Sequence, residues 1–217
     1  IKNRELFIEN CKKGNFPDVC KDCPTLEERE WDETPGFIDV SVSNRTKCSC
    51  DCIYCIISAG GNAEIKHDLN TRETYDIKPV LTQFKEQNMF KKDCHFIIGG
   101  GECSEYPDGE LKWLTDFVFE QNGSIEYLSS GINFSKDIEN ALKAGKTKLK
   151  VSVDAGTKKV YEQVKRVKGY DAVWKNLKKY TDAARKNRNA EVTIKYIIIP
   201  GINDNMKEAK EFIKRCK

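Results

Sequence analysis

Hydrophobic and polar positions along the chain alternate between two spacings. Short runs rich in apolar and β-branched residues recur five times, and each is followed by glycine, proline, serine or a charged residue. Such runs are typical of buried β-strands that end in turns. The sequence therefore predicts strands near residues 37–42, 94–98, 124–129, 148–154 and 192–199.

Between these runs, apolar residues are spaced three and four apart, as on one face of a helix. Helical stripes occur in residues 78–90, 111–118, 138–142 and 203–216. Gly145 follows the third stripe and is a predicted C-cap. The segment Thr157–Lys186 carries two stripes with Gly169 between them, which predicts either two helices or one broken helix.

This repeated β-α order predicts a parallel sheet with helices outside it and ligand chemistry at the carboxyl ends of the strands. We expect an α/β fold, a partial (β/α) barrel of five to six parallel strands, with a small irregular cysteine-rich cap at the N-terminus. The cap covers residues 1–35 and the barrel core covers residues 36–217. A sixth strand would lie beyond Lys217, where the chain stops inside a helical pattern, unless the barrel is unusually short.

Composition narrows the class of protein. The 217 residues are 39% hydrophobic and 33% charged, which suits one main domain, and the formal charge of +3 neither requires nor excludes a nucleic-acid partner. No apolar run approaches the roughly 18 residues of a membrane span, and no signal peptide opens the chain, so we expect a soluble cytoplasmic protein. Ten cysteines that cluster in such a chain favour metal binding over disulfides.

Four cysteines crowd into the segment Cys48–Cys55, directly after the first predicted strand. A disulfide hairpin, a zinc site and an iron–sulfur cluster are the alternatives. Zinc would need ligands from elsewhere, because only Cys52 and Cys55 form a C-x2-C pair here. Cys48, Cys52 and Cys55, spaced C-x3-C-x2-C, could instead hold three corners of a cubane cluster and leave one iron open. Cys50 is interpreted as a non-ligand, a small buried residue.

This C-x3-C-x2-C spacing, with the aromatic Tyr54 just before its last cysteine, resembles the signature of the radical S-adenosylmethionine (radical SAM) superfamily. The resemblance implies that Cys48, Cys52 and Cys55 hold a [4Fe-4S] cluster whose open iron binds S-adenosylmethionine (SAM). It also implies that reduction cleaves SAM to methionine and a 5′-deoxyadenosyl radical. Tyr54 is expected to contact the cofactor.

Other motifs follow the strands in the order that the family shows. Gly100, Gly101 and Glu102 resemble its G-G-E-P motif, with Cys103 in place of the proline, which implies that they receive the amino group of SAM. A loop whose glycines adopt positive φ angles is the alternative. After the third strand, Ser130 resembles part of a T-N-G segment, although serine is also a common turn residue.

The end of the fourth predicted strand resembles the family's S-x-D-A stretch. The resemblance implies that Ser152 and Asp154 face the ribose and the carboxylate of SAM, and that Arg166 pairs with this carboxylate. Asp154 could instead be the N-cap of the following helix. In the region of the fifth strand, the resemblance implies that Ile198 packs against adenine, with an ordinary buried strand and turn as the alternative.

Three further cysteines, Cys11, Cys20 and Cys23, precede the predicted barrel. With a fourth ligand from elsewhere, such as Cys94, Cys103 or Cys216, they could hold zinc or a second iron–sulfur cluster. Their segment resembles part of a SPASM auxiliary-cluster segment, placed before the barrel rather than after it. Free thiols in a small irregular cap are the alternative.

Together these features predict a radical SAM enzyme whose adenosyl radical abstracts hydrogen from a peptide or protein substrate. A small-molecule substrate, such as a sugar or a nucleotide precursor, is the alternative within the same chemistry, and a non-catalytic zinc or iron–sulfur scaffold is the alternative outside it. We expect an electron donor such as ferredoxin or flavodoxin, and neither a membrane nor a nucleic acid as a partner. An oxygen-sensitive cluster also predicts a reducing cytoplasm in a host that lives with little oxygen.

Overall fold

The computed structural model describes residues 2–16, 34–40, 48–55, 76–107 and 109–217. The chain divides into two compact units, Ile1–Glu33 and Thr34–Lys217. The first unit contains helix α1, Lys2–Lys12, although an irregular cap was expected there. The helix was missed because its apolar side chains form no buried stripe, and Leu6 and Phe7 are exposed.

The second unit is built on a parallel sheet, as predicted. Its strands are hydrogen-bonded in the order in which they follow one another along the chain, and every neighbouring pair is parallel. The strands are β1, Phe37–Asp39; β2, His95–Ile98; β3, Ser124–Ser129; β4, Thr147–Ser152; and β5, Ala190–Lys195. This order places all their carboxyl ends along one edge of the sheet.

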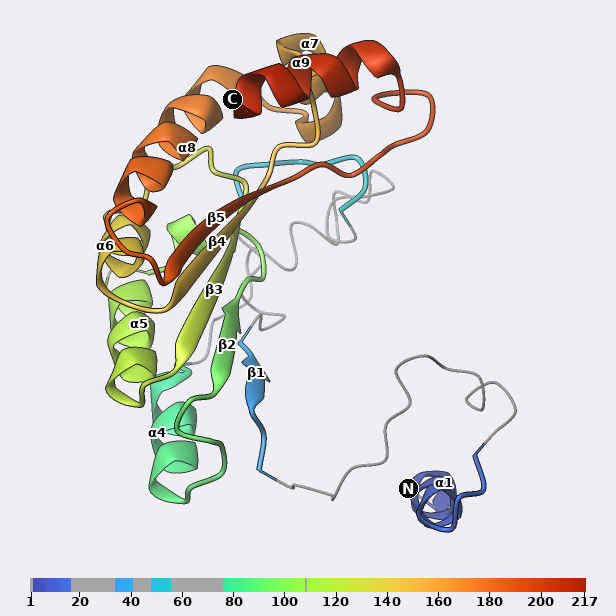
Figure 1. The fold of residues 1–217 in the computed structure, drawn as a ribbon, viewed down its shortest axis with the longest axis vertical. Helices are drawn as coiled ribbons and strands as arrows, with labels where there is room; N and C mark the ends of the chain where they lie inside the picture. The colour runs from blue at the N-terminus through green and yellow to red at the C-terminus, as the bar shows by residue number, and fades with distance from the viewer. Residues whose placement is uncertain (1, 17–33, 41–47, 56–75, 108) are drawn as a thin grey trace. The chain divides into compact units, whose positions relative to one another are not determined.

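Helices connect the strands and cover one face of the sheet (Figure 1). They are α4, Lys78–Glu86; the short 3₁₀ helix η2, Cys103–Glu105; α5, Glu110–Glu120; α6, Lys136–Ala144; α7, Lys158–Lys165; α8, Tyr170–Ala184; and α9, Met206–Cys216. The segment with two stripes therefore forms two helices, α7 and α8. Between them Arg166 adopts a left-handed conformation, with a φ of 55°, and Gly169 is the N-cap of α8.

The core lies between the sheet and these helices. Alternate strand residues point toward the helices and are fully buried, among them Phe96, Ile98, Ile125, Tyr127, Leu149 and Val151. The intervening residues are more polar, and Lys150 pairs with Glu126 at 2.6 Å across two neighbouring strands. The α/β fold of the prediction is confirmed, with the apolar layer on the helix side.

Two glycines stand where other chain segments leave no room for a side chain. Gly145 is the C-cap of α6, as predicted, but its backbone is extended, and a Cβ atom there would lie 2.3 Å from the ring of Phe119. A Cβ atom at Gly156 would lie 2.0 Å from the backbone oxygen of Glu208 in α9. Close packing, and not a left-handed turn, explains these glycines.

Glu208 fastens α9 to the start of α7. Its buried carboxylate accepts hydrogen bonds from the amides of Gly156 and Thr157, at 2.8 and 2.9 Å, and from the Thr157 hydroxyl at 2.7 Å. A negative charge at the N-terminus of a helix is also favoured by the helix dipole. The last helix is thereby attached to the loop that follows β4.

We predict that Gly156→Ala lowers the free energy of unfolding by about 1–3 kcal/mol, the usual cost of overpacking, because the new methyl group would displace the backbone of α9. Gly36→Ala is the control, since its Cβ atom would meet only the flexible Lys91 side chain at 3.6 Å. Denaturant unfolding followed by tryptophan fluorescence measures both. Equal midpoints for the two variants would show that α9 does not pack as described.

Candidate functional site

The cysteine loop, Cys48–Cys55, is held against the end of α7 by backbone hydrogen bonds. The amide of Asp51 donates to the carbonyl of Lys165, and the amide of Ile53 donates to the carbonyl of Val164, both at 3.0 Å. The last carbonyls of a helix have no partner inside the helix, so they are free to bind such a loop. The loop is therefore docked on a rigid element of the fold.

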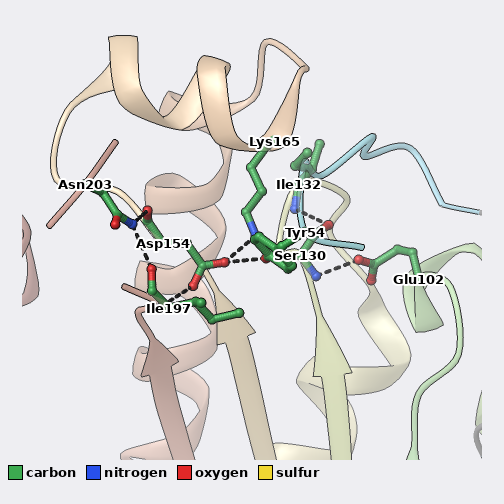
Figure 2. A network of polar contacts seen from close by, with 8 residues as sticks. All are labelled: Tyr54, Glu102, Ser130, Ile132, Asp154, Lys165, Ile197 and Asn203. Carbon is green, nitrogen blue, oxygen red and sulfur yellow. Dashed lines mark hydrogen bonds and ion pairs between the residues drawn. The ribbon is translucent and has the colours of Figure 1, made fainter. Parts of the chain in front are cut away.

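A buried ion pair lies directly behind the loop (Figure 2). Asp154, at the end of β4, is 0% exposed, and the Lys165 side chain, at the end of α7, is 1% exposed, with 2.6 Å between their charged atoms. The hydroxyl of Tyr54 donates to the same Asp154 oxygen at 2.5 Å and accepts from Lys165 at 2.7 Å. Burial, and then the charge of Asp154, raises the pKa of Tyr54, so its phenol stays protonated.

Asp154 also organises the loop after β5. Its second oxygen accepts from the amide of Ile197 at 2.7 Å, and its own carbonyl accepts from the buried side chain of Asn203 at 2.8 Å. Asp154 holds a left-handed backbone, with a φ of 58°, which costs energy for a residue other than glycine. It is not the N-cap of α7, because Thr157 has that place. Its predicted contact with SAM stays a prediction.

Glu102 forms a second buried centre, at the end of β2. It is 1% exposed, and one of its oxygens accepts from the amide and hydroxyl of Ser104 and from the hydroxyl of Ser129. The other oxygen accepts from the amide of Ser130 at 2.6 Å, as Figure 2 shows. Ser130 is thus tied to Glu102, and the ends of β2 and β3 are joined by one carboxylate.

The loop that leads to Glu102 has the backbone expected of a glycine turn. Gly100 and Gly101 have φ angles of 79° and 65°, which other residues adopt only at a cost. Cys103, which replaces the family's proline, is fully buried, and burial raises the pKa of its thiol well above the ordinary value. It begins η2 as a neutral, apolar residue.

The three remaining predicted site residues lie on different segments of the chain. Ser152 is half-buried at the end of β4. The Arg166 side chain is 49% exposed and lies 3.8 Å from Asp51. Ile198 is 68% exposed, and with Met206 of α9 it lines a mostly apolar pocket of about 270 Å³ beside β5. Their roles in binding SAM stay predictions.

The thiols of the loop have the chemistry that an iron–sulfur cluster requires. None of Cys48, Cys50, Cys52 and Cys55 is in a disulfide, and the Cys50 amide donates to the Cys48 sulfur at 3.4 Å. Hydrogen bonding by the Cys50 thiol lowers the pKa of Cys48. Hydrogen bonding by Cys50 also lowers the pKa of Cys52, to about 6, and the positive charge of Lys165 adds to this effect. The thiolate is the form that binds metal.

Within the described residues, no group of three or more His, Cys, Asp or Glu side chains converges on one metal position. The fit therefore rests on the donor types, their spacing and their acidity. In the first unit, Cys11 is half-buried on α1, whereas Cys20 and Cys23 lie outside the described residues. The second metal site and the SPASM resemblance stay predictions.

Comparison with known proteins gives the family. The model of the radical SAM superfamily matches residues 45–213. The chain belongs to the radical SAM superfamily. The resemblance seen in the cysteine loop is thereby confirmed, as is the prediction of an enzyme at the level of the family.

Curated relatives of this radical SAM chain are named as RNA enzymes. The probable dual-specificity RNA methyltransferase RlmN of Streptococcus mutans is 25% identical over 192 residues, which cover 83% of this chain and 50% of that protein. Relatives from other bacteria carry the same name. The chain spans about half the length of the curated relatives it matches.

Solved structures share the fold. SuiB of Streptococcus suis, bound to S-adenosylmethionine, aligns with a TM-score of 0.59 and 15% identity, over 99% of this chain and 42% of that one. The enzyme anSMEcpe, with bound AdoMet and Cp18Cys peptide, aligns with a TM-score of 0.61 and 15% identity, over 83% of this chain and 47% of that one.

The comparison with curated relatives corrects the expectation about a nucleic-acid partner. The expectation that no nucleic acid would be a partner is wrong, because the curated relatives are named as RNA methyltransferases; composition alone had given no information on this point. Among the helices that the structure describes, none is long and apolar enough to cross a membrane.

We predict that Lys165→Met lowers the free energy of unfolding by about 3–5 kcal/mol, because it leaves the buried carboxylate of Asp154 without its cation. The double variant Asp154→Asn with Lys165→Met should recover part of this loss. Lys178→Met is the control, since its partner Asp182 and Lys178 itself are exposed. Denaturant unfolding of the metal-free protein gives all three values, and a single variant as stable as the control would contradict the buried pair.

Proposed function

We propose that this chain binds a [4Fe-4S] cluster through Cys48, Cys52 and Cys55, and that SAM bound to it is cleaved reductively. The observation that carries this proposal is the cysteine loop itself: its thiols are not in disulfides, the pKa values of two of them are lowered, and the loop is docked at the carboxyl edge of a parallel sheet. With both groups bound, one electron cleaves SAM to methionine and a 5′-deoxyadenosyl radical that removes hydrogen from the substrate.

Glu102 is proposed to receive the amino group of SAM. An ionised carboxylate offers about four acceptor positions, and the Glu102 oxygen bound by the Ser130 amide accepts one hydrogen bond from the described residues. That oxygen can accept a further N–H. Gly100 and Gly101, which lack side chains, would let the ligand approach the backbone.

The carboxylate of SAM needs a cation, and two basic side chains lie side by side in the sequence. Lys165 is occupied by Asp154 and Tyr54 inside the fold. The half-exposed Arg166 remains the proposed partner, with the planar fork that suits a carboxylate. Ser152 and Asp154 are proposed beside the ribose, Tyr54 beside the cluster and Ile198 beside adenine. The chain's task is to hold the reacting atoms together and to exclude water and other hydrogen donors.

Anaerobic reconstitution with iron and sulfide tests this activity. With SAM and dithionite, wild-type protein should form 5′-deoxyadenosine, detected by mass spectrometry, whereas the variant Cys48→Ala, Cys52→Ala, Cys55→Ala should form none. Cys216→Ala is the matched control, because it removes an exposed thiol from α9 and should leave the product unchanged. If wild-type protein loads iron but forms no 5′-deoxyadenosine, a non-catalytic iron–sulfur scaffold becomes the better description; bound zinc would favour the zinc scaffold.

RNA is the substrate class that we favour. The support is the likeness to the RNA methyltransferases named above, which extends over most of this chain. A peptide or protein is the second candidate, since two structures of the same fold, SuiB with the precursor peptide SuiA and anSMEcpe with the Cp18Cys peptide, have a peptide bound. We also retain a reducing cytoplasm as the proposed compartment, because oxygen destroys exposed clusters.

A substrate that closes the site should raise 5′-deoxyadenosine formation about tenfold, because it excludes water and commits the radical. We predict this rise with protease-treated bacterial RNA and not with a ribonuclease-treated peptide pool. SAM carrying a ¹³C-labelled methyl group, followed by mass spectrometry of nucleosides, reports transfer to RNA. A rise with peptides alone would reverse the order of the two candidates.

A further inference from the structure

Glu105, in the 3₁₀ helix η2, binds the first half of the cysteine loop, whereas the carbonyls of α7 bind the second half. One oxygen of its half-buried carboxylate accepts from the Ser49 amide at 2.9 Å and also binds the Ser49 hydroxyl. Ser49 lies between Cys48 and Cys50, so this contact is one residue from the first predicted cluster ligand. No feature of the sequence had pointed to Glu105.

Asn133 completes the arrangement. Its side-chain amide donates to the same Glu105 oxygen at 3.0 Å and to the Ser49 hydroxyl at 3.2 Å. Ser49 belongs to the loop that precedes β2, Glu105 follows β2 and Asn133 follows β3. Three loops that are far apart in the sequence therefore meet at one carboxylate oxygen.

Glu105 is not needed to hold its own helix. The N-cap of η2 is Glu102, whose side chain accepts from the Ser104 amide, and the Glu105 amide donates to the Glu102 carbonyl. The Glu105 carboxylate instead accepts hydrogen bonds from residues of the two other loops. A charged acceptor for a backbone amide makes a stronger hydrogen bond than a neutral one.

The two halves of the cysteine loop thus have different anchors. Asp51 and Ile53 are bound to the carbonyls at the end of α7, and Tyr54 is bound to the Asp154–Lys165 pair. The half with Cys48 and Ser49 is bound to Glu105. Without that bond, the first predicted ligand would be free to move relative to the other two.

We propose that Glu105, supported by Asn133, is a positioning residue that sets the place of Cys48 before the cluster is assembled. We call the contacts of Glu105 and Asn133 with Ser49 the clamp. The effect of the clamp on a cluster rests on the proposed function, whereas the clamp itself does not. Residues that orient metal ligands commonly change metal affinity by about 10–100-fold when they are replaced. Glu105 acts through the backbone amide of Ser49, which is next to Cys48 in the chain.

The clamp can be tested without any cofactor, by measuring how fast iodoacetamide alkylates each cysteine of the metal-free protein. In Glu105→Ala, Cys48 and Cys50 should react about tenfold faster than in wild type, because a charge-assisted hydrogen bond that held their loop is lost. Peptide-resolved mass spectrometry separates these thiols from Cys94, which is buried, and Cys216, which is exposed. Both of these should keep their wild-type rates.

Glu105→Gln separates the clamp from a simple change in charge. The amide keeps an acceptor oxygen for Ser49, so its rates should stay within about threefold of wild type, as for a weaker neutral hydrogen bond. If Glu105→Gln reacts as fast as Glu105→Ala, the acceleration reflects the lost charge and the clamp is refuted. Glu120→Ala, on the exposed surface of α5, is the matched control and should behave as wild type.

The reconstituted protein supplies the second readout, the rate at which a chelator removes iron. Glu105→Ala should lose its cluster about tenfold faster than wild type. If wild-type protein binds no cluster, the proposed function fails while the alkylation rates still decide on the clamp. If wild-type protein loads a cluster and alkylation at Cys48 is the same with and without Glu105, the clamp is refuted and the proposed function stands.

Discussion

The buried ion pair between Asp154 and Lys165 is the interaction on which the arrangement of the site depends. Two charges leave water here, and their attraction offsets this cost only when the remaining hydrogen-bonding positions are filled. Asp154 meets that condition with Tyr54 and with the amide of Ile197. One carboxylate thereby joins the end of β4, the end of α7, the cysteine loop and the loop after β5. A substitution that removes one of these contacts therefore also disturbs the geometry of the others.

Other buried polar side chains around the site also take their hydrogen bonds from the fold itself. Glu102 is bound by serine hydroxyls and amides, and Glu208 and Asn203 fasten the surrounding loops to backbone groups. Asp154 and Glu102 each accept hydrogen bonds from more than one segment of the chain, so these segments hold one another in place. This suits a catalyst of radical chemistry, because a reactive intermediate must be kept away from water and from mobile side chains.

The sheet, its helices and the family signature in the cysteine loop could be predicted because their signals are local. Periods of two and of three to four residues, the glycine at position 145 and the spacing of Cys48, Cys52 and Cys55 can all be read within a few residues. Lys165 could not be identified in this way. It stands beside Arg166, and only the direction of the last turn of α7 decides that Lys165 is buried and Arg166 is half exposed. The same holds for Glu105, whose partner Ser49 is 56 residues away.

The correction about RNA has a related physical reason. A net charge of +3 describes the whole chain, whereas recognition depends on where the charges lie. Most residues that carry the proposed SAM chemistry lie at or after the carboxyl ends of the strands, and they would serve an RNA or a peptide equally well. The same fold is accordingly found in a structure with a bound peptide and in a radical SAM methyltransferase. Chemistry and substrate are therefore separate properties of this fold: the strand ends can specify the reaction while leaving the substrate open.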